Sequence, residues 1–143
     1  MIAGIGTDII SVERIHSVIL RRKGRFLNRI FTPQEREYCR SKKFPWIHFA
    51  GRFAAKESVF KVLESGWSLG VRWQDVEILP AENGEPRVTL RGKAKYLAEK
   101  RGITQILVSI SHNRKYAIAT AVGERDDERK NNRRYRLTDR EAS

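Results

Sequence analysis

The longest helical pattern in the chain is WIHFAGRFAAKESVFKVLE, residues 46–64. Pro45 interrupts the segment before it, so a helix is predicted to begin at residue 46 and to run to about residue 64. At about 100° per residue, three aromatic side chains fall on one apolar stripe of this helix. They are Phe49, Phe53 and Phe60. A helix with such a stripe packs against the other elements of its domain.

Two charged residues interrupt this stripe. Counted from Phe49 at 0°, Glu57 falls at about 80° and Lys61 at about 120°, one helical turn apart. Burying a charge without a partner costs several kcal/mol, so both residues need an explanation. Either they pair with each other at the edge of the stripe, or they present a carboxylate and an ammonium group to a cleft suited to metal and phosphate chemistry.

Three elements are predicted before this helix. Residues 2–10 (IAGIGTDII) are apolar and β-branched, and they predict a buried strand that bends near Gly6. Apolar residues at helical spacing predict a helix over residues 12–22. Thr32-Pro-Gln-Glu has the pattern of a capping box, which predicts a second helix over residues 32–41.

The second half of the chain has a β pattern with one helix. Asn83-Gly84 is a hairpin signal between two short alternating segments. The predicted elements are strands 76–79 and 87–90, a helix over 92–101, and strands 106–111 and 116–122 joined by a turn at 112–115. This order predicts an α+β fold, a small antiparallel sheet packed with one long and several short helices, rather than regular βαβ alternation.

Asp8 is a charged residue inside the otherwise apolar segment 2–10. It either caps a nearby helix or shares a Mg²⁺ ion with Glu57, because Mg²⁺ prefers hard oxygen ligands and keeps waters and substrate phosphates in its shell. The neighbouring Gly4-Ile5-Gly6 lacks the Lys-Ser/Thr of a P-loop and the third Gly of a dinucleotide fingerprint, so neither of those sites is predicted.

The other residues with reactive side chains carry weaker signals. Cys39 is the one cysteine, which excludes an internal disulfide and a Cys-rich zinc site, and a catalytic thiol is not expected. His16 and His48 have no partners at metal-ligand spacing, so packing or surface roles are expected. His112 ends a strand beside a turn, where a phosphate contact suits it better than a nucleophile pair with Ser111, since neighbours on a strand point to opposite faces.

The chain has 143 residues, with 29 Lys and Arg against 17 Asp and Glu, for a net charge of +12. Ten basic residues and three acidic ones fall within residues 13–43, so the excess is concentrated there. This predicts an acidic partner: nucleic acid, an anionic surface or an acidic protein. Residues 1–123 are predicted to form one domain, and residues 124–143, with mixed charges and few apolar side chains, a disordered tail.

Two expectations concern location. The sequence has no run of about 18 apolar residues, so no membrane-spanning helix is expected. Its first residues lack the basic and apolar regions of a secretory signal, so a cytoplasmic protein is expected.

Three motifs occur in order and resemble one family. They are Gly4-Ile-Gly-Thr-Asp-Ile-Ile, Ala50-Gly-Arg-Phe-Ala-Ala-Lys-Glu-Ser and Ser109-Ile-Ser-His. Together with Phe31-Thr-Pro-Gln-Glu and Asn83-Gly-Glu-Pro, they resemble the holo-acyl carrier protein synthases, the bacterial 4′-phosphopantetheinyl transferases, over about residues 2–122. One such motif would be weak, whereas several at family-like spacing are strong.

The resemblance implies a reaction and roles for three residues. Enzymes of this family move 4′-phosphopantetheine from coenzyme A to a serine hydroxyl of apo-acyl carrier protein and release adenosine 3′,5′-bisphosphate. Asp8 and Glu57 match the family's Mg²⁺ ligands, and Lys61 matches a lysine that stabilises or protonates the leaving phosphate. Glu57, or a water beside it, is the candidate for removing the serine proton.

The resemblance also implies binding surfaces and an assembly. The positions at the nucleotide end of coenzyme A correspond to Arg52, Asn83, Gly84, Pro86 and His112. Among these, Arg52 and His112 suit the 3′-phosphate. The docking region for the strongly acidic carrier protein corresponds to Arg14, Arg21, Arg22 and Arg25, with Arg14, Arg22 and Arg25 taken as its contacts. The compact form of the family is a homotrimer with three active sites at subunit interfaces.

The sequence departs from the family pattern at two places. Ser58 stands where many relatives have Ala, and Glu64-Ser-Gly-Trp67 replaces a Gly-Thr-Gly-rich segment, so loop contacts with pantetheine are not carried over. Two other functions stay open. A nucleic-acid-binding module would need base-stacking aromatics among Lys and Arg on a sheet face, where strands 106–122 offer Tyr116 alone. A different Mg²⁺-dependent phosphotransferase would share the carboxylates but not the carrier substrate.

Overall fold

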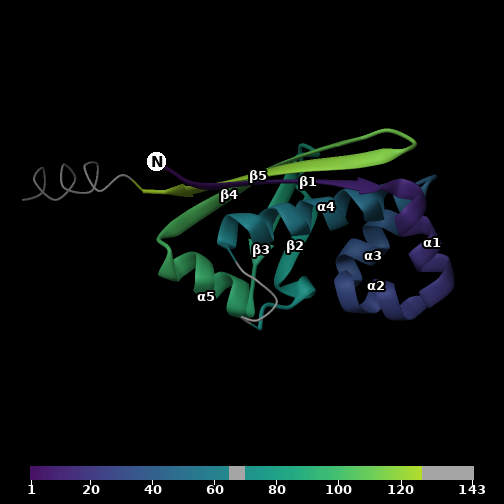
Figure 1. Ribbon diagram of the computed structural model, residues 1–143, viewed down its shortest axis with the longest axis horizontal. Helices are drawn as coiled ribbons and strands as arrows, with labels where there is room; N and C mark the ends of the chain where they lie inside the picture. Colours follow the sequence, from purple (N-terminus) through teal and green to yellow (C-terminus); the bar gives the residue numbers. More distant parts are fainter. Residues whose placement is uncertain (65–69, 127–143) are drawn as a thin grey trace, which may run out of the picture.

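The computed structural model describes residues 1–64 and 70–126 of the chain. Figure 1 shows a sheet along one side of the molecule with the helices beneath it. In chain order the elements are β1 (Ile2–Ser11), α1 (Val12–Arg22), α2 (Gly24–Ile30), α3 (Pro33–Arg40), α4 (Pro45–Leu63), the 3-10 turn η2 (Trp73–Asp75), β2 (Val76–Pro80), β3 (Pro86–Leu90), α5 (Gly92–Lys100), β4 (Ile103–His112) and β5 (Tyr116–Arg125). The predicted α+β class is confirmed.

The five strands form one sheet in the order β1-β5-β4-β3-β2, and each neighbouring pair is antiparallel. The first and last strands of the chain therefore lie side by side, with Asp8 opposite Ala119. β3 meets β4 at the pair Arg87 and Leu107, where the β2–β3 hairpin joins the rest of the sheet. With this topology, strands from both ends of the sequence pack against the same helix, α4.

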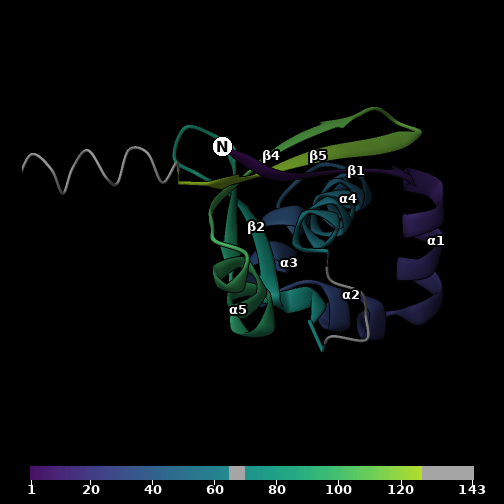
Figure 2. The same ribbon diagram turned by 60° about the vertical axis from the view of Figure 1, so that its left-hand side comes forward.

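α4 crosses beneath β1, β5 and β4 (Figure 2). Small residues let it approach closely, because Ala117, Ala119 and Ala121 of β5 are fully buried on that face. At Gly6 of β1, an added Cβ would lie 2.1 Å from the Ser58 carbonyl oxygen of α4. Gly6 thus allows contact between the strand and the helix. The pairing of β1 with β5 is regular at Gly6, and the register irregularity of β1 falls between Ile2 and Gly4, so a bend near Gly6 stays a prediction.

Within the described residues, nothing covers the opposite face of the sheet. Ile5 and Ile9 of β1 are 69% and 59% exposed, so the prediction of a buried strand over residues 2–10 is wrong for the single chain. Successive side chains of a strand point to opposite faces, and α4 covers one of them. The apolar pattern of residues 2–10 indicates burial of both faces, whereas residues 1–64 and 70–126 cover only one of them.

α4 is surrounded on nearly all sides, and this changes the interpretation of its charges. Lys56 is fully buried and Arg52 is 6% exposed, whereas Glu57 is half-buried and Lys61 is exposed. The buried charges of α4 are therefore Arg52 and Lys56, and the prediction that Glu57 and Lys61 are the buried ones is wrong. The arc that contains Phe53, Glu57 and Lys61 is the open side of the helix, because α1 and α2 leave a cleft there.

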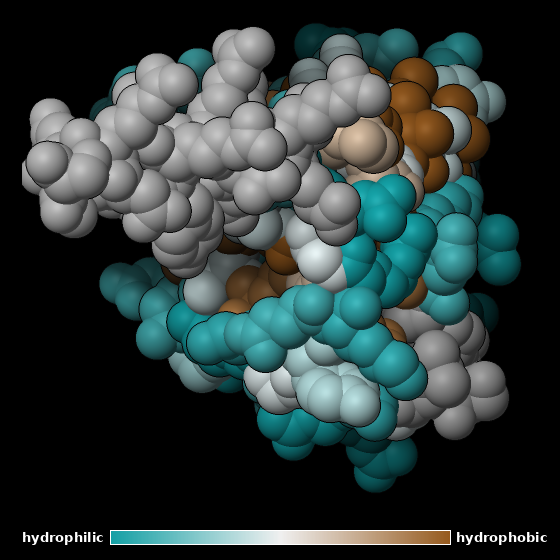
Figure 3. Space-filling view, turned by 90° about the vertical axis from the view of Figure 1, so that its left-hand side faces the viewer, coloured by the Kyte–Doolittle hydropathy of each residue, from teal (hydrophilic) through white to brown (hydrophobic). Residues whose placement is uncertain are grey.

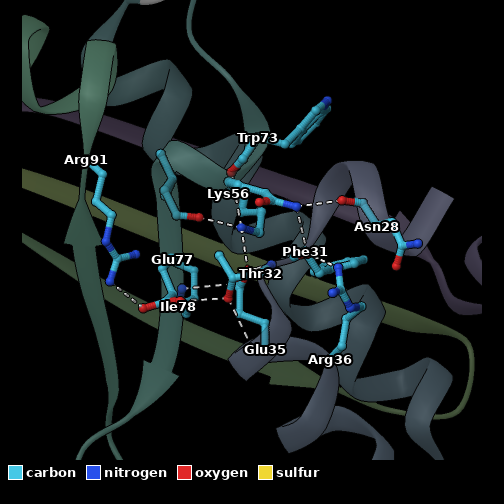
Figure 4. Close-up of polar contacts among 12 residues, drawn as sticks. Asn28, Phe31, Thr32, Glu35, Arg36, Lys56, Trp73, Glu77, Ile78 and Arg91 are labelled. Atoms are coloured by element: carbon cyan, nitrogen blue, oxygen red, sulfur yellow. Dashed lines mark hydrogen bonds and ion pairs between the residues drawn. The ribbon is translucent and has the colours of Figure 1, made fainter. Parts of the chain in front are cut away.

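A buried polar network holds Lys56 in place (Figure 4). The Lys56 Nζ lies 2.8 Å from Oε1 of Glu35, and it donates to the Trp73 carbonyl oxygen at 3.2 Å and to that of Val76. Glu35 also closes the predicted capping box at Thr32 and accepts from the Ile78 N–H at 2.9 Å. The network therefore ties the start of α3 to α4 and β2.

Two parts of the fold differ from the predicted elements. α2 was not predicted: it has seven residues and follows Lys23, whose positive φ of 51° breaks it from α1. β5 continues through Arg125, two residues past the expected end of the domain. The rest of the expected tail, residues 127–143, lies outside the described residues. Within residues 1–64 and 70–126, no helix is both long and apolar enough to cross a membrane.

Candidate functional site

A cleft of about 430 Å³ opens where β1, α1, α2 and α4 meet. Four charged side chains line it, and three of them come from segments with an apolar pattern: Asp8, Glu57 and Lys61. The lining is completed by Ile10, Arg14, Ile15, Val18, Phe26 and Phe53. Asp8 faces the cleft because β1 runs along α4, and Glu57 and Lys61 face it because they are one helical turn apart. The structure thus brings together the three residues that the sequence marked as anomalies.

Lys61 is paired with Asp8. Its Nζ lies 3.6 Å from the Asp8 Oδ1 and donates to the Thr7 carbonyl oxygen at 2.6 Å. The expected alternative of a Glu57–Lys61 pair is not formed within the described residues. Asp8 does not cap α1 either, since the side chain of Ser11 accepts from the Arg14 N–H at that helix start.

The cleft raises the pKa of both carboxyl groups. For Glu57 the main cause is burial, and the nearby charge of Asp8 raises its pKa further while Lys61 opposes the shift. For Asp8 burial again raises the pKa, and the charge and hydrogen bond of Lys61 act in the other direction. Two partly desolvated carboxylates therefore lie near the one ammonium group of Lys61.

The donor set fits a hard divalent cation. Both carboxylates supply oxygen atoms, and Mg²⁺ in phosphoryl-transfer sites takes one or two carboxylates and completes its shell with substrate phosphates and water. Across residues 1–64 and 70–126, no cluster of three or more His, Cys, Asp or Glu residues could hold a metal by itself. The pair of Asp8 and Glu57 is thus suited to a metal that the substrate helps to bind.

The residues expected at the nucleotide end lie elsewhere on the chain. Arg52 is on another side of α4, with its guanidinium carbon 4.3 Å from the centroid of the Tyr38 ring. His112 ends β4, and its ring centroid is 5.4 Å from that of His48. None of these four side chains lines the cleft of Asp8.

The β2–β3 hairpin forms a third location. The Asn83 side chain accepts from the Glu85 N–H at 3.1 Å, and Gly84 has a φ of +87°, which a side chain would strain. Asn83 and Pro86 line a separate cavity of about 1060 Å³ between β3, β4 and α5. In one chain, the five residues expected at the nucleotide end are therefore not joined to Asp8, Glu57 and Lys61.

The basic residues of the expected docking region extend from the cleft along α1 and α2. Arg14 lines the cleft itself. Arg21, Arg22 and Arg25 surround a shallow hollow of about 600 Å³ where α1 turns into α2. Sequence reasoning missed Phe26 as part of the cleft, because α2 was not predicted. The helical spacing of Phe26, Leu27 and Ile30 was a signal that could have indicated this helix.

The thiol is not part of the cleft. Cys39 is fully buried, and burial raises its pKa to about 12. His16 stacks on Trp46 with ring centroids 4.4 Å apart. The stacking of His16 agrees with the packing or surface role expected for it. Of the departures from the family pattern, Ser58 is buried and donates to the Ala55 carbonyl oxygen, whereas residues 65–67 lie outside the described residues.

Comparison with known proteins assigns the family. Residues 4–121 match the model of the 4′-phosphopantetheinyl transferase superfamily. The chain is 53% identical over 118 residues to the holo-acyl-carrier-protein synthase of Caldanaerobacter subterraneus subsp. tengcongensis, which covers 82% of this chain and 91% of that protein. It is 48% identical over 132 residues to the holo-acyl-carrier-protein synthase of Desulforudis audaxviator, and the match covers 91% of this chain and 100% of that protein.

Solved structures agree. The holo-acyl-carrier-protein synthase of Neisseria meningitidis superposes with a TM-score of 0.80 at 31% identity, covering 87% of this chain and all of that one. The enzyme of Helicobacter pylori, solved in complex with coenzyme A, superposes with a TM-score of 0.74 at 33% identity. The match covers 84% of this chain and 99% of that one. The chain belongs to the 4′-phosphopantetheinyl transferase superfamily and, within it, to the holo-acyl-carrier-protein synthases. It is an enzyme of the transferase class.

Proposed function

We propose that this chain transfers 4′-phosphopantetheine from coenzyme A to a serine hydroxyl of an apo-acyl carrier protein in a Mg²⁺-dependent reaction. The observation that carries the proposal is the convergence of Asp8, Glu57 and Lys61 on one cleft in a member of this family. The Helicobacter pylori relative binds coenzyme A, and a solved relative from Bacillus anthracis contains coenzyme A (3′,5′-ADP). The second product is accordingly adenosine 3′,5′-bisphosphate.

The side chains of the cleft suit the steps of this reaction. The serine oxygen forms a bond to the β-phosphorus of coenzyme A while the bond from that phosphorus to the bridging oxygen breaks. Glu57 accepts the serine proton, since its carboxylate lines the cleft in which the serine would react. Lys61 Nζ, held by Asp8, lies where it can stabilise the negative charge of the leaving phosphate.

Mg²⁺ belongs to the same proposal. The oxygen atoms of Asp8 and Glu57 would hold it, and when bound it neutralises charge on the pyrophosphate. Asp8 also has a role that does not depend on the metal, because its carboxylate positions the ammonium group of Lys61.

A homotrimer with active sites between subunits is the assembly we propose. Two observations favour it. The nucleotide-end residues Arg52 and His112 are separate from the cleft of Asp8 in one chain, so a neighbouring copy could supply them. The uncovered sheet face also exposes large apolar side chains in aligned positions, with Ile9 opposite Ile118.

This apolar sheet face is extensive. Its exposed members are Ile5, Ile9, Leu107, Tyr116 and Ile118. Figure 3 shows a group of hydrophobic side chains at the upper right of the view, on the side of the molecule where Figure 1 draws β1, β4 and β5. Contiguous exposed apolar surface of this kind is typical of protein interfaces.

The acidic carrier protein is proposed to dock on the basic surface next to the cleft. Arg14 reaches the cleft, and Arg22 and Arg25 continue the positive charge along α1 and α2. A serine delivered over this surface would enter the cleft that Glu57 lines. We place the enzyme in the cytoplasm, in the synthesis of fatty acids, where acyl carrier proteins act.

A transfer assay on a purified apo-carrier tests the proposal. The full chain, freed of metal with a chelator, is expected to be inactive, and added Mg²⁺ is expected to restore incorporation of the phosphopantetheine group. A carrier whose acceptor serine is replaced by alanine is the matched control and should stay unmodified. Incorporation that proceeds equally with and without the chelator would contradict the role of Mg²⁺.

A further inference from the structure

A cluster of cationic and protonatable groups lies where α3, α4 and the end of β4 meet. It consists of Tyr38, His48, Arg52 and His112, and we refer to it as the His48 cluster. The Arg52 guanidinium stacks on the Tyr38 ring at 4.3 Å, and the His48 ring meets the Tyr38 ring at 6.2 Å and the His112 ring at 5.4 Å. The ammonium group of Lys42 lies 4.8 Å from the Tyr38 ring.

No acidic side chain compensates this cluster within the described residues. The charges that act on His48 belong to Arg52 from α4, His112 from β4 and Lys42 from the segment after α3, and all three lower its pKa. The fourth neighbour, Tyr38 of α3, contributes an aromatic ring. Arg52 is 6% exposed, and its Nε is buried without a hydrogen-bond partner in the part of the chain described.

Such an arrangement calls for an anionic ligand. An uncompensated cation in a buried position is unfavourable, and an anion with several acceptor oxygens would relieve it. A phosphate monoester suits the cluster, because such a group carries a charge of about −1.5 to −2 near pH 7. This value is known for phosphorylated side chains, and the monoester of a nucleotide has the same chemistry. The two imidazole rings and the guanidinium group can each donate to it.

His48 is the member whose protonation would change on binding. Burial, followed by the charges of Arg52, His112 and Lys42, lowers its pKa, so its imidazole is neutral near pH 7 in the ligand-free protein. A phosphate placed among these groups opposes their repulsion and favours the imidazolium form. The pKa of His48 therefore rises on binding and a proton is taken up. Affinity increases as the pH falls through the interval between the pKa of the free protein and that of the complex.

We propose that His48 is a specificity-determining residue that takes up a proton when the 3′-phosphate of coenzyme A binds at Arg52 and His112. This inference rests on the proposed function and adds a third ligand and a proton linkage to the phosphate site. It predicts that the enzyme distinguishes coenzyme A from 3′-dephospho-coenzyme A more strongly at mildly acidic pH than at alkaline pH.

Isothermal titration calorimetry of the full chain tests this inference. Coenzyme A and 3′-dephospho-coenzyme A are titrated in buffers of different ionisation enthalpy at several pH values, which gives the number of protons taken up. With the wild-type chain and coenzyme A we expect uptake of up to about one proton near pH 6.5. His48→Phe should lose this uptake, and it should bind coenzyme A about fivefold more weakly at about pH 6 but within about twofold of the wild type at about pH 8.5.

Two controls make the result specific. His16→Phe removes an imidazole that stacks on Trp46, outside the His48 cluster, and should keep the wild-type proton uptake. The dephosphorylated ligand should give the same weak pH dependence with the wild type and with His48→Phe. Thermal melting of each variant establishes that the chain is folded.

Three results would overturn the inference. The first is unchanged proton uptake in His48→Phe, and the second is equal proton uptake by the wild type with coenzyme A and with 3′-dephospho-coenzyme A. Either result would remove His48 from the phosphate site, and the proposed function would stand if transfer continues. Failure of the folded wild type to bind either ligand would contradict the proposed function as well.

Discussion

Asp8, Glu57 and Lys61 show how far single residues can be interpreted before a structure is known. A charge inside an apolar pattern is visible in the sequence, so all three residues needed an explanation. The pattern left local pairing or capping and a functional site open, and the family resemblance favoured the site. Their partners were not visible. Spacing along a helix pairs Lys61 with Glu57, whereas packing of β1 on α4 places Asp8 3.6 Å from Lys61. Contacts between distant segments depend on tertiary packing, which periodicity does not encode.

Cys39 supports a prediction at the same scale. Burial raises its thiol pKa to about 12 from the usual 9.0, so between those values the unfolded chain releases a proton that the folded chain keeps. The contribution of the protonated Cys39 thiol to the free energy of unfolding is complete below about pH 9, and it is lost as the pH rises from about 9 to about 12. The free energy of unfolding should therefore fall by up to about 1.4 kcal/mol per pH unit in this interval.

Urea unfolding of the wild type and of Cys39→Ala at pH values from about 8 to about 10.5 measures this difference. The wild type should lose stability more steeply above about pH 9 than the variant does. Parallel curves for the two proteins would show that the thiol ionises equally well in the folded state.

Individual elements were predicted where local rules apply. The capping box at Thr32, the hairpin around Asn83-Gly84 and the long helix all depend on short-range spacing, and each is confirmed. α2 was missed because it is short and follows α1 after a one-residue break. The burial of Lys56 was also missed, since its neutralising partner Glu35 is 21 positions away and belongs to another helix.

The Lys56–Glu35 pair leads to a prediction about the stability of the fold around α4. Lys56→Met should destabilise the fold by about 3–5 kcal/mol, because it leaves the carboxylate of Glu35 buried without its cation. Combining Lys56→Met with Glu35→Leu should recover part of this loss. Chemical denaturation measures both variants, with the exposed Lys100→Met as control, for which a change within about 0.5 kcal/mol is expected. A single variant as stable as this control would contradict the account of the network.

At the scale of the whole molecule, the separation of the cleft from the His48 cluster predicts behaviour of mixed assemblies. Glu57→Gln and Arg52→Ala should each be inactive alone. Coexpressed in equal amounts, they should regain about a quarter of the wild-type activity, because a site between subunits needs an intact Glu57 from one copy and an intact Arg52 from its neighbour.

Glu57→Gln coexpressed with Lys61→Ala is the matched control. Both residues belong to the same cleft of one chain, so this mixture should stay inactive. Recovery in neither mixture, with assembled and folded protein, would show that each chain carries a complete site by itself.

The basic surface predicts how the carrier is recognised. Arg14→Glu should raise KM for the carrier by about tenfold and leave the affinity for coenzyme A unchanged, with a larger effect at low ionic strength. Lys93→Glu, on α5 and away from the cleft, should have little effect. Steady-state kinetics at two salt concentrations measures both. Weaker binding of coenzyme A, with unchanged KM for the carrier, would move Arg14 from the docking surface to the nucleotide site.

The net charge of +12 illustrates what whole-chain properties can and cannot predict. It indicates an acidic partner, but nucleic acid and an acidic protein meet that condition equally well. The family assignment together with the cleft beside Arg14 distinguishes them in favour of the carrier protein. The exposed face of the sheet was not predictable, because apolar alternation looks the same whether a helix or another subunit covers it.

The mass of an apo-acyl carrier protein, measured by intact mass spectrometry after incubation with the enzyme, coenzyme A and Mg²⁺, tests the central claim most directly. The wild type should add one phosphopantetheine group per carrier. Glu57→Gln, folded as judged by thermal melting, should add it at least about 100-fold more slowly, while Glu64→Gln, exposed near the same helix end, should match the wild type. No mass gain with the folded wild type, or full activity of Glu57→Gln, would contradict the account.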